Sequence, residues 1–253
     1  MRDLLAKEEY FISFYTEMKK LIGQSKERIS NKIITGEKVP LAKHRIFGKS
    51  LEMLISRYSK GDSIQEIKSE YSITLDLMVD GWDELAVKFY QGRPPNRIML
   101  DKYFLMPYNY MIWMLSLAIL LKVSKKDTNT LKSIIEEGNI KDRLIIMLLS
   151  SLTGSQTVQK TEETTYNPFS GLFKIDKLID TERQMESYLD KWYKKTKLLT
   201  WHNYKPDNER YFYFGRWCFE AAAVTCIKGL DDSSYRDHPY YPKDLADYYR
   251  ANQ

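Results

Sequence analysis

The side chains that most often carry catalysis are scarce in this sequence and are not grouped. There are three histidines, His44, His202 and His238, and two cysteines, Cys218 and Cys226. No two histidines, and no Glu–His pair, have the spacing of a metal site. P-loop, nucleophile-elbow and dinucleotide-binding motifs are also missing from the sequence. We therefore expect no catalytic residues, no metal ligands and no cofactor, and we predict that the protein is not an enzyme.

His238 is the histidine whose neighbours best suit acid–base chemistry. Asp237 precedes it and Pro239 follows it. A carboxylate beside a histidine can hold the ring in place as a general base. A histidine in such a position more often fixes a turn through a hydrogen bond, and this is the interpretation we favour.

Charge gives a stronger signal than catalytic chemistry. The chain has a net charge of +5, yet one stretch contains seven acidic residues and a single basic one, Lys68. The acidic residues are Asp62, Glu66, Glu70, Asp76, Asp80, Asp83 and Glu84. A surface of this kind would attract a basic partner protein. A solvated helix face that tolerates like charges explains the same pattern equally well.

We expect a helix over residues 73–90 to position the centre of this acidic stretch. Its apolar face would consist of residues that recur at helical spacing, namely Met78, Trp82, Leu85 and Phe89. Its opposite face would carry Asp76, Asp80 and Asp83. Just before this helix, Gly61 is expected to end the preceding helix, and Asp62 or Ser63 to cap the next one. If Ser63 is the cap, Glu66 completes a capping box.

Two other segments are weaker candidates for binding. Asp231 and Asp232 form a second acidic site, but we favour a role for them in capping the following turns through side-chain to backbone hydrogen bonds. Residues 191–204 place lysines among aromatic residues, which suits single-stranded nucleic acid. These lysines are Lys191, Lys194, Lys195 and Lys197. An amphipathic helix with Trp192 in the core and the lysines in water is the interpretation we favour.

A buried helix is predicted over residues 214–227, where nearly every side chain is apolar or small. Gly229, followed by Leu230, fits a left-handed C-terminal cap with its hydrophobic contact. The two cysteines lie eight residues apart, about 12 Å along a helix, so they cannot form a disulfide. We expect them to be small buried side chains in a reducing compartment.

Composition and periodicity predict an all-α fold, a compact multi-helix body built from two fused halves. Gly and Pro are few, at 11 and 8 residues, and no segment indicates a strand. Further helices are expected over residues 3–35, around Phe47–Tyr58, and over 100–121, 128–137, 140–152 and 175–199, with a polar loop at 153–167. The polar run 124–130 is the expected seam between domains 1–125 and 126–253. The apolar run Met111–Leu121 is too short to span a bilayer, and the charged N-terminus lacks a signal core, so we expect a cytoplasmic protein.

Motifs in both halves resemble one known family. The N-terminal half contains MRDLLAKEEYFISFY, RYSKGDSIQEIKSEY and MIWMLSLAILLKV, and the C-terminal half contains FEAAAVTCIKGLDDSSYRDHPYYPKDL. Together they resemble the PoNi family of immunity proteins, which protect bacteria against PoNe-type DNase toxins. The residues that mark the resemblance are expected to be structural: Tyr58, Gly61, Trp217, Glu220, Gly229, His238, Pro239, Tyr240, Tyr241 and Pro242.

The resemblance implies an immunity protein that binds a cognate nuclease toxin and neutralises it stoichiometrically. It further implies a place in interbacterial competition through type VI secretion, with no direct nucleic-acid or membrane partner. Immunity proteins of nucleases are often acidic overall, whereas this chain carries +5. If a DNase is the partner, the acidic surface must therefore be local. The alternative function is a helical nucleic-acid-binding protein that uses residues 191–204.

Overall fold

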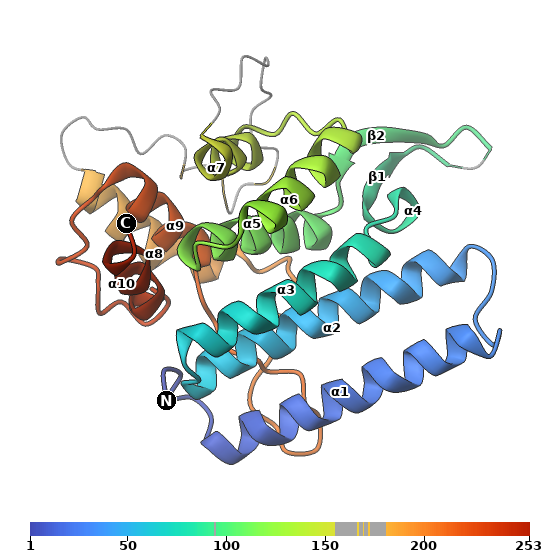
Figure 1. Cartoon of the computed structure of the whole chain (residues 1–253), viewed down its shortest axis with the longest axis horizontal. Coiled ribbons are helices and arrows are strands. Elements are labelled where there is room, and N and C mark those ends of the chain that lie inside the picture. The colour runs from blue at the N-terminus through green and yellow to red at the C-terminus, as the bar shows by residue number, and fades with distance from the viewer. Residues whose placement is uncertain (94, 155–165, 167–168, 170–171, 173–180) are drawn as a thin grey trace. The chain divides into compact units, whose positions relative to one another are not determined.

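The computed structural model describes residues 1–93, 95–154, 166, 169, 172 and 181–253. Within these residues the regular structure is helical except for two short strands, which confirms the predominantly helical fold (Figure 1). The contacts divide the chain into two compact units. The first comprises Met1–Leu100 and Asn203–Arg216, and the second Asp101–His202 and Trp217–Gln253.

Three long helices form the body of the first unit. They are α1 (Glu8–Ser30), α2 (Lys38–Lys60) and α3 (Ile64–Gly81), and α2 packs between the other two (Figure 1). Each helix buries one apolar stripe, as the helical spacing predicts. In α2 this stripe includes Phe47, Leu51, Leu54 and Tyr58. A single turn, α4 (Glu84–Val87), and the strand β1 (Lys88–Gln91) follow α3.

The segment Asn203–Arg216 belongs to the first unit although it lies far along the chain. The hydroxyl of Tyr213 donates to Asp3 Oδ2 at 2.5 Å, and the Tyr213 N–H donates to the Tyr10 hydroxyl at 3.0 Å. Ser59 Oγ donates to the carbonyl oxygen of Phe214 at 2.8 Å. The domains 1–125 and 126–253 stay a prediction, and a fragment that ends at residue 125 would lack these three hydrogen bonds.

The second unit is organised around α5 (Leu105–Leu120), which is buried along almost its whole length. It contacts α6 (Lys125–Glu137), α7 (Arg143–Thr153), α9 (Phe219–Lys228) and α10 (Lys243–Ala251), while α8 (Thr181–Lys195) contributes Trp192 to the same core. The strand β2 (Ile98–Tyr103) pairs with β1, and the boundary between the units falls within β2.

The local signals in the sequence give the observed helix ends. Gly61 ends α2 with a φ of 105°, and Ser63 caps α3 in a full capping box with Glu66. The buried helix near the C-terminus is α9, whose residues from Phe219 to Cys226 are all buried. Gly229 ends it with a φ of 62°, and the Leu230 N–H donates to the Thr225 carbonyl oxygen at 3.0 Å. These helix ends and the burial of α9 are confirmed, whereas its predicted start at residue 214 is wrong, because α9 begins at Phe219.

The predicted helix over residues 73–90 is wrong. Helix α3 ends at Gly81, and Asp83 begins the separate turn α4 by accepting a hydrogen bond from the Leu85 N–H. Trp82 leaves the helical stripe because its ring packs against His44, at 5.5 Å between centroids. The following residues, Lys88–Gln91, form β1, so the absence of strands is also wrong.

Other boundaries move by smaller amounts. The polar run 124–130 is not an irregular linker, because the side chain of Ser124 caps α6 by accepting from the Asp127 N–H, and its place as the seam between two domains stays a prediction. Helix α1 starts at Glu8 instead of residue 3, and α5 starts at Leu105 instead of residue 100. The predicted loop 153–167 and the start of the helix predicted over 175–199 lie largely outside the described residues.

Candidate protein-binding surface

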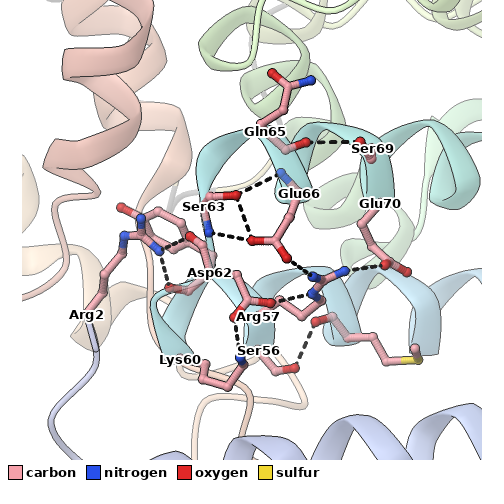
Figure 2. Close-up of polar contacts among 12 residues, drawn as sticks. Arg2, Ser56, Arg57, Lys60, Asp62, Ser63, Gln65, Glu66, Ser69 and Glu70 are labelled. Carbon is pink, nitrogen blue, oxygen red and sulfur yellow. Dashed lines mark hydrogen bonds and ion pairs between the residues drawn. The ribbon is translucent and has the colours of Figure 1, made fainter.

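The junction between α2 and α3 is an ion-pair network centred on Arg57 (Figure 2). The guanidinium donates through Nε to Asp62 at 2.5 Å, through Nη1 to Glu70 at 2.9 Å and through Nη2 to Glu66 at 3.3 Å. Lys60 makes a further ion pair with Asp62. Arg57 can reach all three carboxylates because the turn at 61–63 folds the start of α3 back beside the last turn of α2.

Arg2 closes the same junction from the N-terminal segment. Its Nη1 donates to the carbonyl oxygens of Tyr58 and Asp62, at 3.0 and 2.8 Å (Figure 2). The first of these carbonyls lies in the last turn of α2, where backbone acceptors lack partners within the helix. The side chain also lies over the Tyr58 ring, 4.6 Å from its centroid. The segment RYSKGDS, residues 57–63, therefore builds a turn that is held by side-chain hydrogen bonds.

The electrostatics of this network follow from its hydrogen bonds. Burial acts to raise the pKa of Asp62, but the hydrogen bonds from Lys60 and Arg57 outweigh it and hold that pKa below its usual value. The Ser63 hydroxyl and N–H lower the pKa of Glu66. Each of the three carboxylates thus has an ion-pair partner within the unit. Partner binding by Asp62, Glu66 and Glu70 stays a prediction. The internal ion pairs argue against it, because these carboxylates already have partners within the unit.

The remaining acidic residues of the stretch are exposed, but they do not lie on one helix. Asp76 and Asp80 lie one turn apart on α3, and Asp80 accepts from Lys43 Nζ at 2.6 Å. Asp83 and Glu84 lie beyond the end of α3, at the start of α4. The single acidic stripe of Asp76, Asp80 and Asp83 is therefore corrected to two short acidic groups in succession. Their contact with a partner stays a prediction.

The second acidic site, Asp231 and Asp232, divides into two different environments. Asp231 is exposed and accepts from the Ser233 N–H at 3.0 Å, which is the turn-capping bond that the sequence favoured. Asp232 is buried, accepting from the Tyr241 hydroxyl at 2.9 Å and from Arg250 Nη1 at 2.8 Å. Asp232 is therefore held inside the unit, and partner binding by this pair stays a prediction.

The HPYYP segment, residues 238–242, packs through its backbone and rings. His238 Nδ1 accepts from the Tyr240 N–H at 3.3 Å, while Nε2 lies 3.6 Å from Asp190. The carbonyl oxygen of Tyr240 accepts from the Cys218 N–H at 2.8 Å, and Tyr241 is buried. This geometry fits the turn-fixing role expected of His238. At the two ends of the turn, Pro239 is exposed and Pro242 is buried.

Glu220 is fully buried in the core of the second unit. Its Oε1 accepts from Trp192 Nε1 at 2.6 Å and lies 3.4 Å from the Tyr188 hydroxyl. Burial raises the pKa of the carboxyl above its usual value, against the opposing effect of these hydrogen bonds. Trp217 precedes this site and is also buried. Glu220 is thus a buried, titratable side chain that accepts hydrogen bonds from Trp192 and Tyr188 of α8.

Glu220→Gln is expected to flatten the dependence of stability on pH. A carboxyl whose pKa is raised by folding stabilises the protein while protonated, and that contribution is lost as the pH rises through the folded-state pKa. Between pH 5 and pH 8, the free energy of unfolding should therefore fall less in Glu220→Gln than in the wild type. We expect a difference of about 1 kcal/mol or more, measured by urea unfolding at both pH values. Equal slopes would show that Glu220 does not titrate differently on folding.

The lysine-rich segment does not offer its indole rings for base stacking. Trp192 and Trp201 are buried and stack on each other, with 5.5 Å between centroids. Tyr193 stacks on His202 at 4.1 Å. This arrangement supports the amphipathic-helix interpretation of α8 and weakens the nucleic-acid alternative.

Exposed apolar residues within the acidic stretch were not predicted from the sequence. Ile73 and Val79 lie on the outer face of α3, and Leu85 is exposed on α4. The helical spacing of the buried residues of α3 places Ile73 and Val79 outside its buried stripe, but this stripe could be assigned only once the end of α3 at Gly81 was known.

Neither a metal-binding cluster nor a membrane-spanning helix occurs in the part of the chain that the structure describes. There, no group of three or more His, Cys, Asp or Glu side chains is placed to hold a metal ion. Nor does any described helix combine the length and apolar character required to cross a membrane.

Comparison with known families defines the class of the protein. The family model described as "PoNe immunity protein (PoNi), N-terminal" matches residues 2–133, and that described as "PoNe immunity proteins (PoNi), C-terminal" matches residues 140–245. The fold is thus that of a two-part helical immunity protein. The chain belongs to the PoNi family of PoNe immunity proteins.

A solved structure has a similar fold. Protein PA2201 from Pseudomonas aeruginosa superposes with a TM-score of 0.66 at 18% sequence identity, covering 96% of this chain and 88% of that one. At this level of identity the likeness shows the fold alone. The comparison with curated proteins gives no match.

Proposed function

We propose that the protein binds a cognate nuclease toxin and neutralises it by forming a stoichiometric complex in the cytoplasm. The observation that carries this proposal is the match of both halves of the chain to the PoNi family. Inhibition requires no chemistry on the part of the inhibitor. We place the protein in interbacterial competition, as protection against a DNase delivered by type VI secretion.

A plasmid-degradation assay tests this function. The nuclease domain of a cognate PoNe toxin is held at fixed concentration, and the protein is added in increasing amounts. We expect nuclease activity to fall linearly and to end at one equivalent, as for tight stoichiometric binding. Loss of activity at far less than one equivalent would indicate an enzyme that modifies the toxin. Full activity in excess protein would contradict the proposed function.

We further propose that the exposed acidic residues of α3 and α4 guide the toxin to its site. Nuclease domains carry basic surfaces for DNA, and clustered opposite charge accelerates association. Asp76, Asp80, Asp83 and Glu84 supply that charge locally, within a chain of net charge +5. A basic partner can therefore be attracted to this surface although the chain as a whole is basic.

Charge reversal at this site is expected to slow association with the toxin. Because Asp83 caps α4, the test variant combines Asp76→Lys, Asp80→Lys and Glu84→Lys and leaves the cap intact. Its association rate should fall about 10-fold or more at low salt and approach the wild-type rate at high salt. The control variant, Glu27→Lys, Glu37→Lys and Glu137→Lys, has the same net charge with exposed sites elsewhere. Equal slowing in both variants would show that net charge, and not this surface, steers the toxin.

The nucleic-acid alternative makes the opposite prediction. Under that hypothesis the same reversal would tighten DNA binding, and Lys194→Glu with Lys195→Glu would abolish it. A DNA mobility-shift assay on both variants separates the two functions.

A further inference from the structure

Exposed apolar side chains are concentrated along one part of the first unit. Of the fourteen large apolar side chains that are exposed among the described residues, six lie between residues 73 and 99. They are Ile73, Val79, Leu85, Phe89, Ile98 and Met99. Four of these six follow one another over the C-terminal half of α3, α4 and β1. Single exposed apolar residues are ordinary, whereas a group of them marks an interaction site.

The helical frame shows how these side chains lie on α3. The buried stripe contains Ile67, Tyr71 and Met78 and faces α2. At 100° per residue, Asp76 points away from that stripe. Ile73 and Val79 lie to either side of Asp76 on the outer face of the helix. The exposed fractions of Ile73 and Val79 are 55% and 54%, so neither is covered within the unit.

Acidic residues surround these apolar side chains. Asp76 lies between Ile73 and Val79, and Asp83 and Glu84 directly precede Leu85. Residues 69–87 include no basic residue and Lys88 is buried, while Lys43 of α2 pairs with Asp80 and Arg97 lies over the Tyr90 ring, 3.9 Å from its centroid. The surface therefore combines an apolar centre with an acidic margin. We call it the α3–β1 patch, defined by Ile73, Val79, Leu85, Phe89, Asp76, Asp83 and Glu84.

We infer that the α3–β1 patch is the surface on which the basic toxin docks, with Val79 and Leu85 at the centre of the contact. This inference rests on the proposed function and adds to it the residues that hold the complex together. Interfaces commonly bury a small apolar centre inside a polar margin, and the centre supplies most of the affinity. Charge complementarity selects the occupant, because the acidic margin fits a basic surface.

A second copy of this chain does not fit the patch. In a two-fold dimer the same patch lies on both sides of the interface. Asp76, Asp83 and Glu84 of the two copies would then face one another, and such like-charge juxtaposition is costly.

The test separates the apolar centre from the acidic margin by their kinetics. Val79→Ser with Leu85→Ser should raise the dissociation rate of the toxin complex about 10-fold or more and leave the association rate within about 2-fold. Asp76→Asn with Glu84→Gln should do the reverse, slowing association with little effect on dissociation. Both pairs are exposed, so both variants should retain the wild-type melting temperature. Leu4→Ser with Leu198→Ser, at exposed apolar sites elsewhere, is the matched control.

Each outcome decides a different question. If wild-type protein inhibits the toxin but Val79→Ser with Leu85→Ser dissociates at the wild-type rate, the docking surface is wrong and the proposed function stands. If wild-type protein neither binds nor inhibits the toxin, the proposed function itself is wrong. If light scattering shows a wild-type dimer that the same variant converts to a monomer, the patch binds a second copy and this inference is overturned.

Discussion

Arg57→Ala will lower the free energy of unfolding by about 3 kcal/mol, because it removes the ion pair of the buried Glu70 carboxylate and leaves buried Asp62 paired with Lys60 alone. Asp62 and Glu70 have side chains only 8% and 9% exposed, and both receive hydrogen bonds from Arg57. Removing one member of a buried ion pair costs far more than the pair itself contributes. Urea unfolding at neutral pH and moderate salt measures the loss.

Two controls identify the cause. Lys43→Ala removes the exposed ion pair with Asp80 and should cost less than about 1 kcal/mol. Adding Asp62→Asn and Glu70→Gln to Arg57→Ala removes the stranded charges and should recover a large part of the loss. If the triple variant is no more stable than Arg57→Ala, the loss comes from the missing side-chain packing of Arg57 and not from charge.

Gly81→Ala will lower the free energy of unfolding by about 2 kcal/mol, through overpacking of α2 against α3. A Cβ at this position would lie 2.6 Å from the Lys43 carbonyl oxygen and 2.9 Å from the His44 nitrogen. Both atoms belong to the backbone of α2, so the two helices must separate. The ring of His44 would also lose part of its contact with Trp82. Thermal and urea unfolding measure the effect.

The matched control is Gly23→Ala in α1, where a Cβ would meet nothing within 4 Å. Alanine favours a helix interior over glycine, so this substitution should raise stability by about 0.5–1 kcal/mol. Opposite signs for the same chemical change at Gly81 and Gly23 would isolate the contact between the helices. A gain in stability at both positions would contradict the close approach of α2 and α3.

The sequence predicted features that depend on neighbouring residues. The helix end at Gly61, the left-handed end at Gly229 and the capping box expected if Ser63 is the cap depend on local backbone geometry and were correct. The buried helix α9 was also recognisable, because no polar face interrupts it. Such signals require no knowledge of the rest of the chain.

The errors arose where distant residues decide the structure. The spacing of Met78, Trp82, Leu85 and Phe89 continues a helical pattern past Gly81, but contact with α2 ends the helix there. Likewise, counting acids between Asp62 and Glu84 leaves out Arg57, which forms ion pairs with three of them from just outside the stretch.

Two further features required the folded structure. Tyr213 forms hydrogen bonds with Tyr10 and Asp3, which lie 203 and 210 positions earlier in the chain. No local sequence pattern predicts such contacts. The candidate surface could be predicted as acidic, whereas its apolar centre emerged only when α3 had its correct frame.

Hydrogen–deuterium exchange of the protein with and without the toxin nuclease domain tests the central claim most directly. It reports, segment by segment, which backbone amides become protected when the complex forms. We expect protection to concentrate in peptides that cover residues 73–91, with little change in peptides that cover α8 or the C-terminal α10. Protection confined to α8, α10 or the segment 231–242, with exchange across 73–91 unchanged in a saturated complex, would contradict the α3–β1 patch as the binding surface.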